Sequence, residues 1–539
     1  MTDPGCYAPE PLKLNPSQLS KYLLLSMTHE KLDLKLDHVF DGLFDVGSDG
    51  IPVFKMYVSG RWRSSSSGKT QEIKSPIDGT LLARVASAGD EDVMAAVGSA
   101  YESRHKIRDI PAIERIEIFR EAEMLIQKHK NSFVQILVAE SGKPYSDAEG
   151  EVNASISRMN LTMEDARKIF GEYIPGDWAE DTLGKIALVL REPIGVVAAI
   201  SPFNYPLFLM VSKVVPALLS GNTVVAKPPS SNPLATILFA KLLEDSQVPE
   251  GTLQVLTGRG GNIGDALVSD DRIGMVSFTG STAVGRQIAS LAGIKKHHLE
   301  LGGKGAAIIL EDCDLDLAAE RCITGSFKNA GQRCDAISIV YAVNGIAENF
   351  VSKVVEKAAR WKTGDPRDPT VNIGPLIDQK AAEHVQSLVD DAISNGAKLL
   401  NGGSHKDCFF EPTVLDKVPL SARIACEETF GPVVTIVRVR DEDEAIETAN
   451  NSRFGLDSCV FTNNFYKIWK IGKKLQCGEV TINDFPRHGV GFFPFGGWKD
   501  SGVGREGIGY TIEEMTNLKT ITFNMEPAGL GKTRHVGRM

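Results

Sequence analysis

The sequence predicts an α/β fold built around parallel sheets. From residue 194 to residue 278, short and almost wholly apolar segments alternate with stretches of helical apolar spacing, and a second alternation begins at residue 306. Near-continuous apolar strands separated by helices are typical of a parallel sheet covered on both faces. The chain has 539 residues, of which 42% are hydrophobic. We therefore expect two large α/β domains with smaller appendages.

The first alternation supplies the elements of one sheet. We expect strands over residues 194–200, 222–226, 253–256 and 275–278, and helices over residues 206–219, 234–243 and 263–268. The stretch from about residue 90 to 170 has helical apolar spacing. Ligands bind at the carboxyl ends of the strands in such sheets, so the residues that follow these strands are candidates for a binding site.

The second alternation predicts strands over residues 306–310 and 337–343 and helices over residues 315–327 and 347–360. Cys334 lies near the start of this unit. Between the helical stretch and the first strand, Pro175-Gly176 stands between two β-like stretches of the segment 171–190, which predicts a hairpin arm. Residues 1–55 have mixed polarity and predict a peripheral extension, helical in part.

Charge and cysteine content narrow the class of protein. The 59 Lys and Arg against 69 Asp and Glu give a net charge of −10, which argues against a nucleic-acid or anionic-membrane partner but leaves room for a local basic pocket. Eight scattered cysteines without Cys-x-x-Cys suit a reducing cytosol, and His297-His298 has no matching metal-ligand set. The N-terminus lacks a signal-peptide layout. We expect a cytoplasmic protein with no metal and no membrane contact.

Cys334 and Glu300 are the candidate catalytic pair. Cys334 follows Gly331-Gln332-Arg333, and Glu300 lies in Leu299-Glu300-Leu301-Gly302-Gly303. A lone cysteine is usually a small buried hydrophobe. A cysteine in a glycine-entered turn together with a glutamate in a glycine-bounded segment indicates a thiol nucleophile and a general base. That pairing fits a thioester that reacts with water.

Three segments that follow predicted strands carry candidate ligand contacts. Gly280 and Ser281 open a helix whose N-terminus favours an anion such as a pyrophosphate, although the turn could simply cap the helix. Lys227 follows the predicted strand 222–226, at the edge of the sheet where ligands bind. The alternative is that Lys227 is an ordinary surface lysine. Ser230 stands close by without a carboxylate to bind a ribose 2′-hydroxyl, so this turn better tolerates a 2′-phosphate. Asn204 lies between prolines and is either an oxyanion donor or a turn residue.

Taken together, these motifs resemble the aldehyde dehydrogenase superfamily over about residues 56–524. The resemblance includes Glu427-Glu428-Thr429-Phe430-Gly431-Pro432 and Pro494-Phe495-Gly496-Gly497-Trp498-Lys499-Asp500-Ser501-Gly502. It implies that Cys334 is the nucleophile, Glu300 the general base, and Asn204 the oxyanion donor alongside the Cys334 backbone N–H. The implied cofactor contacts are Lys227 to the adenine ribose, Ser281 to the pyrophosphate, and Glu428 and Phe430 to the nicotinamide ribose. Ser230 replaces the acid common in NAD-specific members, which favours NADP or use of both NADP and NAD.

The resemblance also implies a domain plan and a self-assembly. The expected parts are an N-terminal extension over residues 1–55, a cofactor-binding domain over 56–170 and 193–302, a catalytic domain over 303–493, and an oligomerisation arm over 171–192 and 510–526. We expect the chain to form a homotetramer or homodimer. We also expect it to bind a small aldehyde as its substrate.

A closer resemblance is to the archaeal non-phosphorylating glyceraldehyde-3-phosphate dehydrogenases. It rests on Arg333 before the nucleophile, on Tyr205 after the oxyanion Asn, and on the stretches Asn483-Asp484-Phe485-Pro486-Arg487-His488-Gly489, Gly364-Asp365-Pro366-Arg367-Asp368-Pro369-Thr370 and Gly504-Arg505-Glu506-Gly507-Ile508-Gly509-Tyr510. Arginines beside the thiol can grip a substrate phosphate bidentately. The alternative is that Arg333 or Arg487 pairs only with a local carboxylate.

The expected reaction is irreversible oxidation of glyceraldehyde 3-phosphate to 3-phosphoglycerate through a cysteine thioester hydrolysed by water. A second enzymatic hypothesis is oxidation of a non-phosphorylated aldehyde such as glyceraldehyde, lactaldehyde or a semialdehyde, which needs no phosphate grip. A hypothesis of another class, a catalytically inactive binding or structural protein, would be favoured by loss of Cys334 or Glu300, and the sequence retains both.

Overall fold

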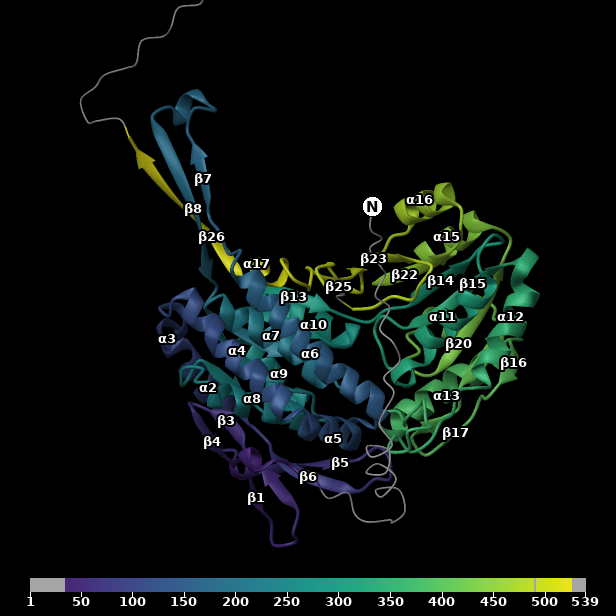
Figure 1. Ribbon diagram of the computed structural model, residues 1–539, viewed down its shortest axis with the longest axis horizontal. Coiled ribbons are helices and arrows are strands. Elements are labelled where there is room, and N and C mark those ends of the chain that lie inside the picture. The colour runs from purple at the N-terminus through teal and green to yellow at the C-terminus, as the bar shows by residue number, and fades with distance from the viewer. Residues whose placement is uncertain (1–33, 489–490, 526–539) are drawn as a thin grey trace, which may run out of the picture. The chain divides into compact units, whose positions relative to one another are not determined.

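The computed structural model describes residues 34–488 and 491–525, which belong to one unit from Leu34 onward (Figure 1). Within these residues the first large sheet has eight strands in the order β25-β13-β12-β9-β10-β11-β3-β4. Its strands are β3 (Met56–Val58), β4 (Arg61–Arg63), β9 (Val196–Ile200), β10 (Thr223–Lys227), β11 (Leu253–Val255), β12 (Ile273–Thr279), β13 (Lys296–Glu300) and β25 (Gly502–Val503). The five from β13 to β11 are parallel, and the edge strands are antiparallel.

The first predicted alternation is confirmed. Every residue of β9 and of β10 is buried, which explains why β9 is wholly apolar and the centre of β10, residues 224–226, is apolar. The helices of this half are α2 (Asp90–Glu102), α3 (Arg104–Arg108), α4 (Ala112–Lys128), α5 (Lys130–Ser141), α6 (Tyr145–Ala166), α7 (Pro206–Leu219), α8 (Leu234–Asp245), α9 (Gly260–Ser269) and α10 (Thr282–Ala292). α7 has the predicted bounds because Pro206 occupies its first turn. α9 is longer than the predicted 263–268 at both ends.

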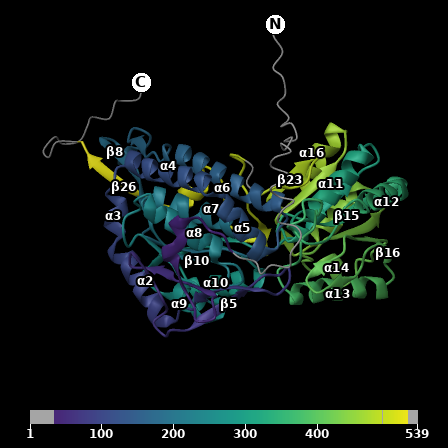
Figure 2. The ribbon, with the colours of Figure 1, turned by 60° about the horizontal axis from the view of Figure 1, so that its bottom comes forward.

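The second sheet has seven strands in the described part of the chain, in the order β16-β19-β20-β15-β14-β22-β23. They are β14 (Gly305–Ile309), β15 (Ile337–Val343), β16 (Lys398–Asn401), β19 (Thr413–Asp416), β20 (Val433–Val439), β22 (Asp457–Phe461) and β23 (Glu479–Ile482). The helices of this half are α11 (Leu315–Phe327), α12 (Asn344–Ala358), α13 (Gln379–Ser394), α14 (Arg423–Cys426), α15 (Glu442–Asn450) and α16 (Phe465–Lys474). Figure 2 shows α11 and α12 beside β15, against which both pack.

The connection between the sheets places the candidate catalytic residues. Glu300 is the last residue of β13, and β14 begins at Gly305. The chain therefore passes from the first sheet to the second within residues 301–304. Cys334 lies just before β15 begins at Ile337. The carboxyl end of one sheet and the amino end of the other thus bracket the site.

The predicted hairpin arm is present as a three-stranded sheet. β7 (Glu172–Pro175) and β8 (Lys185–Pro193) pair antiparallel, and β26 (Thr516–Asn524) pairs antiparallel along the whole of β8. Figure 1 shows these strands extending away from the helices of the first half. Short elements complete the described chain: η2 (Glu180–Thr182), α17 (Thr511–Glu514), β17 (His405–Lys406), β18 (Phe409–Phe410), β21 (Phe454–Gly455) and β24 (Trp498–Lys499).

The predicted N-terminal extension is attached to the rest of the chain from Asp37 onward, while its residues 1–33 lie outside the described residues. η1 (His38–Leu43) buries Phe40 edge-to-face against Phe133 of α5, with ring centroids 6.2 Å apart. β1 (Phe44–Val46) and β2 (Pro52–Phe54) then join β6 (Leu81–Ala86) and β5 (Thr70–Lys74) in one sheet. The described part of the extension is therefore mostly strand and 3-10 helix.

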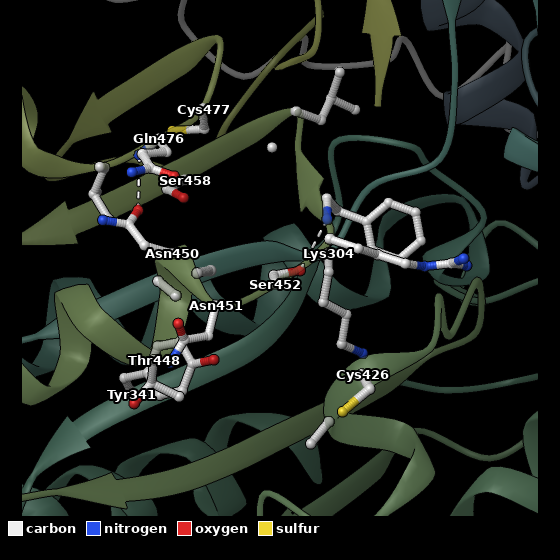
Figure 3. A pocket seen from close by; sticks show the side chains of 18 of the residues that line it. Lys304, Tyr341, Cys426, Thr448, Asn450, Asn451, Ser452, Ser458, Gln476 and Cys477 are labelled. Atoms are coloured by element: carbon white, nitrogen blue, oxygen red, sulfur yellow. Dashed lines mark hydrogen bonds between the residues drawn. The ribbon is translucent and has the colours of Figure 1, made fainter. Parts of the chain in front are cut away.

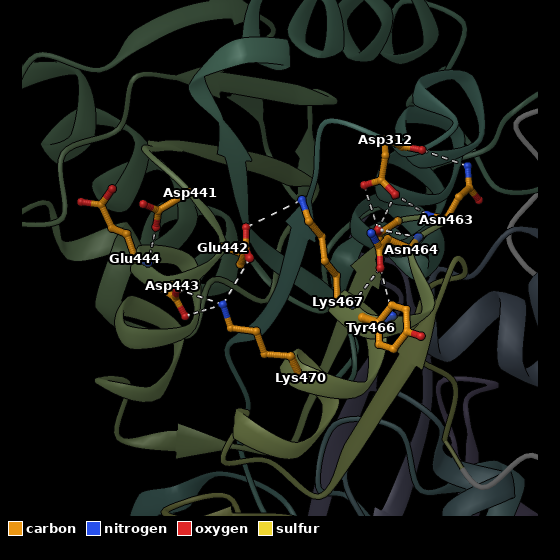
Figure 4. Close-up of polar contacts among 11 residues, drawn as sticks. Asp312, Asp441, Glu442, Asp443, Glu444, Asn463, Asn464, Tyr466, Lys467 and Lys470 are labelled. Atoms are coloured by element: carbon orange, nitrogen blue, oxygen red, sulfur yellow. Dashed lines mark hydrogen bonds and ion pairs between the residues drawn. The ribbon is translucent and has the colours of Figure 1, made fainter.

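The acidic run from Asp441 to Glu444 is accounted for by local contacts. Asp441 accepts from the Glu444 backbone N–H and so caps α15, while Lys470 of α16 pairs with both Glu442 and Asp443 (Figure 4). Across the described residues, no group of three or more His, Cys, Asp or Glu side chains could hold a metal ion. The helices described there include none long and apolar enough to cross a membrane.

Candidate active site

Two cavities meet at Cys334. The cofactor-side cavity, of about 630 Å³, lies at the carboxyl ends of β9, β10 and β12 and is lined by all of the predicted cofactor contacts: Lys227, Ser230, Gly280, Ser281, Glu428 and Phe430. The substrate-side cavity, of about 340 Å³, is lined by all of the predicted substrate contacts: Tyr205, Arg333 and Arg487. Asn204 and Cys334 line both cavities. A group bound in either cavity therefore reaches the same thiol and the same amide.

The loop before Cys334 has an unusual backbone. Asn329, Ala330 and Gly331 have φ of 53°, 55° and 71°, so three consecutive residues are left-handed. This conformation is strained for residues other than glycine and persists only where the surroundings fix it. A Cβ on Gly331 would lie 2.1 Å from the Gly431 carbonyl oxygen, which excludes any side chain there. The nucleophile loop thus packs directly on the backbone beside Phe430.

A second close approach joins the Cys334 and Glu300 segments. A Cβ on Gly303 would lie 2.5 Å from the Cys334 carbonyl oxygen. Only glycine lets these two backbones come so near, which explains the glycines after Glu300. The segments that carry the predicted nucleophile and the predicted base are therefore in close backbone contact.

Cys334 is partly exposed, and its surroundings disfavour the thiolate. Burial raises the pKa of the Cys334 thiol well above its ordinary value, and the nearby Asp335 raises it further, whereas Arg333 opposes these effects. The free protein therefore holds Cys334 mainly as the thiol near neutral pH. The described cysteines are all free of disulfides.

Glu300 lies beside the two cavities rather than in their walls. Its side chain is buried, and its Oε1 is 3.2 Å from His298 Nε2, while Oε2 has no hydrogen-bond partner among the described residues. Burial raises the pKa of Glu300 well above its usual range, and Glu506 adds to the rise, while Lys213 and Arg505 lower it. A raised pKa favours the protonated carboxyl group and makes the ionised form, which general-base catalysis requires, a stronger base.

Asn204 is held where the two cavities join. Its side chain is buried, its Oδ1 has no partner within the described residues, and its backbone oxygen accepts from Asn329 Nδ2 at 3.2 Å. Oδ1 can only accept a hydrogen bond, so the atom that could donate to an oxyanion is the Nδ2 nitrogen of the same amide. The oxyanion role of Asn204 stays a prediction beside the turn alternative.

The cofactor-side contacts fit a dinucleotide. Lys227 is only 5% exposed, so the surface-lysine alternative is wrong; its Nζ donates to the Pro228 oxygen at 2.9 Å, and burial lowers its pKa to about 8. Ser281 is the N-cap of α10, and its Oγ accepts from Val284 N. The helix N-terminus beside it adds a partial positive charge for a pyrophosphate. Ser230 lies at the same edge, with its Oγ donating to the Gly258 oxygen.

Glu428 is anchored by the segment that follows Glu300, and a residue that the sequence analysis missed supports it. The Gly303 N–H donates to Glu428 Oε1 at 3.2 Å, and Lys304 Nζ donates to Thr429 Oγ1 at 3.0 Å. Burial lowers the pKa of Lys304 to about 7. Phe430, with φ of 50°, stacks edge-to-face on Phe203 across the cofactor-side cavity. The strand that follows Lys304 was predicted, but Lys304 itself gave no sequence signal of this contact.

Lys304 also lines a third, rear cavity of about 670 Å³ in the second half of the chain. Figure 3 shows Lys304 and Cys426 among the side chains around it, with Asn450 hydrogen-bonded to Gln476. Asp457, which lines this cavity, is 3% exposed, and neither carboxylate oxygen has a hydrogen-bond partner in the described chain. The rear cavity was not predicted.

The two predicted phosphate arginines line the substrate-side cavity, and both also pair with local carboxylates. Arg333 Nη2 is 2.9 Å from Asp335 Oδ2 and donates to the Pro486 oxygen, while its buried Nη1 has no hydrogen-bond partner among the described groups. Arg487 Nη2 is 3.0 Å from Asp484 Oδ2, and its side chain is half exposed. One nitrogen of each guanidinium group therefore pairs with a local carboxylate, as the alternative interpretation states.

Sequence reasoning missed three further residues of the substrate-side cavity. Arg158 of α6 and Lys328 add positive charge to its wall, and His488 adds an imidazole. His488 Nε2 is 3.1 Å from Glu506 Oε2, and Lys213 Nζ is 3.6 Å from Glu506 Oε1. His488 belongs to the motif of residues 483–489, and its position next to Arg487 was the one feature of the sequence that could have indicated its place in this cavity.

Comparison with known proteins identifies the family. The chain matches the model of the aldehyde dehydrogenase family over residues 62–521. It is 39% identical over 475 residues to the NADP-dependent glyceraldehyde-3-phosphate dehydrogenase of Streptococcus equinus, covering 88% of this chain and 99% of the relative. It is 36% identical over 473 residues to the lactaldehyde dehydrogenase of Methanococcus aeolicus, covering 87% and 100%.

A solved structure agrees with this. The NADP complex of NADP-dependent glyceraldehyde-3-phosphate dehydrogenase from Bacillus halodurans is 38% identical, with a TM-score of 0.86 and coverage of 88% of this chain and 99% of that one. The chain therefore belongs to the aldehyde dehydrogenase family and has its fold, as predicted. Its reaction is the NAD(P)-dependent oxidation of an aldehyde.

Proposed function

We propose that the protein oxidises glyceraldehyde 3-phosphate irreversibly to 3-phosphoglycerate, with NADP as the preferred acceptor. The observation that carries this proposal is the shared position of Cys334 and Asn204 between a dinucleotide-sized cavity and a cavity whose wall includes arginines as well as carboxylates. The first cavity suits the cofactor, and the second suits an aldehyde with an anionic tail.

The chemistry follows from the positions of the side chains. The Cys334 thiol loses its proton to solvent, its sulfur bonds to the aldehyde carbon, and the Asn204 Nδ2 amide with the Cys334 backbone N–H holds the alkoxide. A nicotinamide held in the cofactor-side cavity by Lys227, Ser281 and Glu428 would accept the hydride that leaves this carbon, and the carbon–oxygen double bond would re-form as a thioester. Glu300 then takes a proton from water as its oxygen attacks the thioester, the C–S bond breaks, and the acid leaves. No acyl phosphate forms because water is the second nucleophile.

The phosphate grip rests on Arg333, Arg487 and Tyr205. Arg333 keeps one unused, buried Nη1, and a charge-assisted hydrogen bond to that nitrogen would satisfy it. Arg487 is half exposed and can leave Asp484 at small cost, since exposed ion pairs contribute only about 0–1 kcal/mol. The name of the Streptococcus equinus relative supports the same substrate.

A specific observation favours a second candidate, the oxidation of a non-phosphorylated aldehyde such as lactaldehyde. Asp335 and Asp484 already neutralise part of the charge on Arg333 and Arg487. The lactaldehyde dehydrogenase relative, at 36% identity, is almost as similar as the NADP-dependent glyceraldehyde-3-phosphate dehydrogenase relative, at 39%. On this reading the arginines order the loop around Cys334 and do not bind substrate.

The cofactor preference and the assembly are further parts of the proposal. Ser230 near Lys227 offers no carboxylate to repel a 2′-phosphate, which favours NADP and permits NAD. The arm exposes Tyr173, Trp178 and Leu518, and such an apolar surface suits burial against another copy in a homodimer or homotetramer. The cytoplasmic location stays a prediction.

One initial-rate panel tests the substrate and the cofactor together. Glyceraldehyde 3-phosphate and glyceraldehyde are each compared with NADP and with NAD, without inorganic phosphate. The proposal expects the highest kcat/KM for glyceraldehyde 3-phosphate with NADP. Equal kcat/KM for the two aldehydes favours the second candidate.

A further inference from the structure

In the described chain, His298 makes the one side-chain hydrogen bond to the Glu300 carboxyl group, at 3.2 Å. Both residues lie on β13, two positions apart, so their side chains emerge on the same face of the strand. His298 is 1% exposed. A Cβ on Gly504 would lie 2.7 Å from His298 Cδ2, so the imidazole is enclosed by the backbone of the neighbouring loop.

The enclosed imidazole is neutral. Burial, reinforced by Lys213, lowers the pKa of His298 to about 3. A neutral imidazole has one N–H donor and one acceptor nitrogen, so Nε2 can donate to a carboxylate without bringing a second charge into the site. Such a donor fixes the orientation of a base without forming an ion pair that would hold it inactive.

The two oxygens of Glu300 are therefore unequal. Oε1 is 3.2 Å from His298 Nε2, while Oε2 is buried and has no partner among the described residues. A buried acceptor oxygen without a hydrogen-bond partner costs free energy, and gaining a proton or a hydrogen-bond donor would remove that cost. The contact thus assigns one oxygen to orientation and leaves the other for chemistry.

We propose that His298 is a positioning residue for deacylation: it holds Oε1 of Glu300 and leaves Oε2 to take the proton of the hydrolytic water. In that step a water O–H bond breaks, the proton moves to Oε2, the water oxygen bonds to the acyl carbon, and the C–S bond to Cys334 breaks. The inference rests on the proposed role of Glu300 as the base. A histidine that only filled space would not affect this step selectively.

The test compares His298→Gln with His298→Met. The two replacements have nearly the same size, but only Gln keeps an N–H donor, so their ratio removes the effect of altered packing. The aldehyde is glyceraldehyde with NADP, and the readouts are the burst of NADPH, steady-state kcat and KM. His297→Gln is the control, because His297 is half-buried next to His298 and contacts only the Lys295 oxygen in the described contacts.

The expected result is a selective loss of deacylation in the Met variant. It should keep a full burst and an unchanged KM but lose about tenfold or more in kcat, because general-base catalysis is worth about 10²- to 10⁴-fold. Gln should recover most of that loss. On a Glu300→Gln background, His298→Met should cause no further loss, since both changes act on one step.

Two outcomes separate the inference from the proposed function. Equal kcat in the Gln and Met variants, or a Met variant as fast as wild type, overturns the role of His298 alone. If Glu300→Gln itself shows no stalled deacylation, the base assignment fails and the inference fails with it.

Discussion

Cys334 and Asn204 both line the cofactor-side and substrate-side cavities, and the other predicted ligand contacts each line one of the two. Among the described residues, these two are the ones that the two cavities share, so the proposed covalent attack and oxyanion stabilisation would take place where the cavities meet. The glycines at 303 and 331 make this position available, because each allows a backbone contact that a Cβ would block.

Replacement of the thiol should abolish activity but not cofactor binding. Cys334→Ala removes the atom that bonds to the aldehyde, while the contacts to the cofactor lie elsewhere in the cavity. The measurements are dehydrogenase rate and NADPH fluorescence titration. Cys426→Ala is the control, because that exposed cysteine lines the rear cavity and should keep full activity. Residual turnover above about 1% in Cys334→Ala contradicts the assignment.

A carboxylate introduced at Ser230 should shift the cofactor preference toward NAD. Ser230→Glu places a negative charge where the proposal puts the 2′-phosphate, and the same carboxylate can accept from the 2′-hydroxyl of NAD. We expect kcat/KM with NADP to fall more than kcat/KM with NAD. Ser230→Ala, which adds no charge, should keep the wild-type ratio. An unchanged ratio in Ser230→Glu means that this turn does not face the 2′ position.

The raised pKa of Cys334 predicts alkaline activation of the free thiol. Burial and Asp335 disfavour the thiolate, so its fraction should keep rising with pH beyond about 8.5, the ordinary pKa of a cysteine. Inactivation by iodoacetamide in protein without cofactor measures this, in a Cys426→Ala background that removes the exposed thiol. A rate that levels off at about pH 7 is inconsistent with the burial and the carboxylates around Cys334.

Much of the first sheet could be predicted because its central strands are buried on both faces. β9 is a continuous apolar run, β10 has an apolar centre at residues 224–226, and Pro206 marks the start of α7. The chain from about residue 361 to 510 was left without predicted elements. β21, β24 and β25 have only two residues each, so they carry no periodicity, and their pairing is set by distant partners.

The candidate site could be predicted from motifs, but its electrostatic partners could not. The pairing of Arg333 with Asp335 was visible only as a spacing of two residues. The contact of His298 with Glu300 has the same spacing and follows from the strand period once β13 is known. Glu506 contacts Lys213 and His488, which are not its neighbours in the sequence, so no local sequence pattern predicts these two contacts.

The central claim is that the arginines hold a substrate phosphate, and Arg487 tests it most cleanly because it does not adjoin the nucleophile. The measurement is kcat/KM for glyceraldehyde 3-phosphate and for glyceraldehyde in wild type, Arg487→Ala and Asp484→Asn. Asp484→Asn is the matched control: it frees Arg487 from its carboxylate while retaining the guanidinium.

Arg487 is half exposed, so its contact with phosphate should be worth about 1.5 kcal/mol, the lower end for a hydrogen bond to a charged group. We predict that Arg487→Ala lowers kcat/KM for glyceraldehyde 3-phosphate about tenfold and changes that for glyceraldehyde by less than about twofold, while Asp484→Asn keeps or raises the preference for the phosphorylated aldehyde. Equal losses for the two aldehydes in Arg487→Ala would contradict the phosphate grip and leave the non-phosphorylated aldehyde as the substrate.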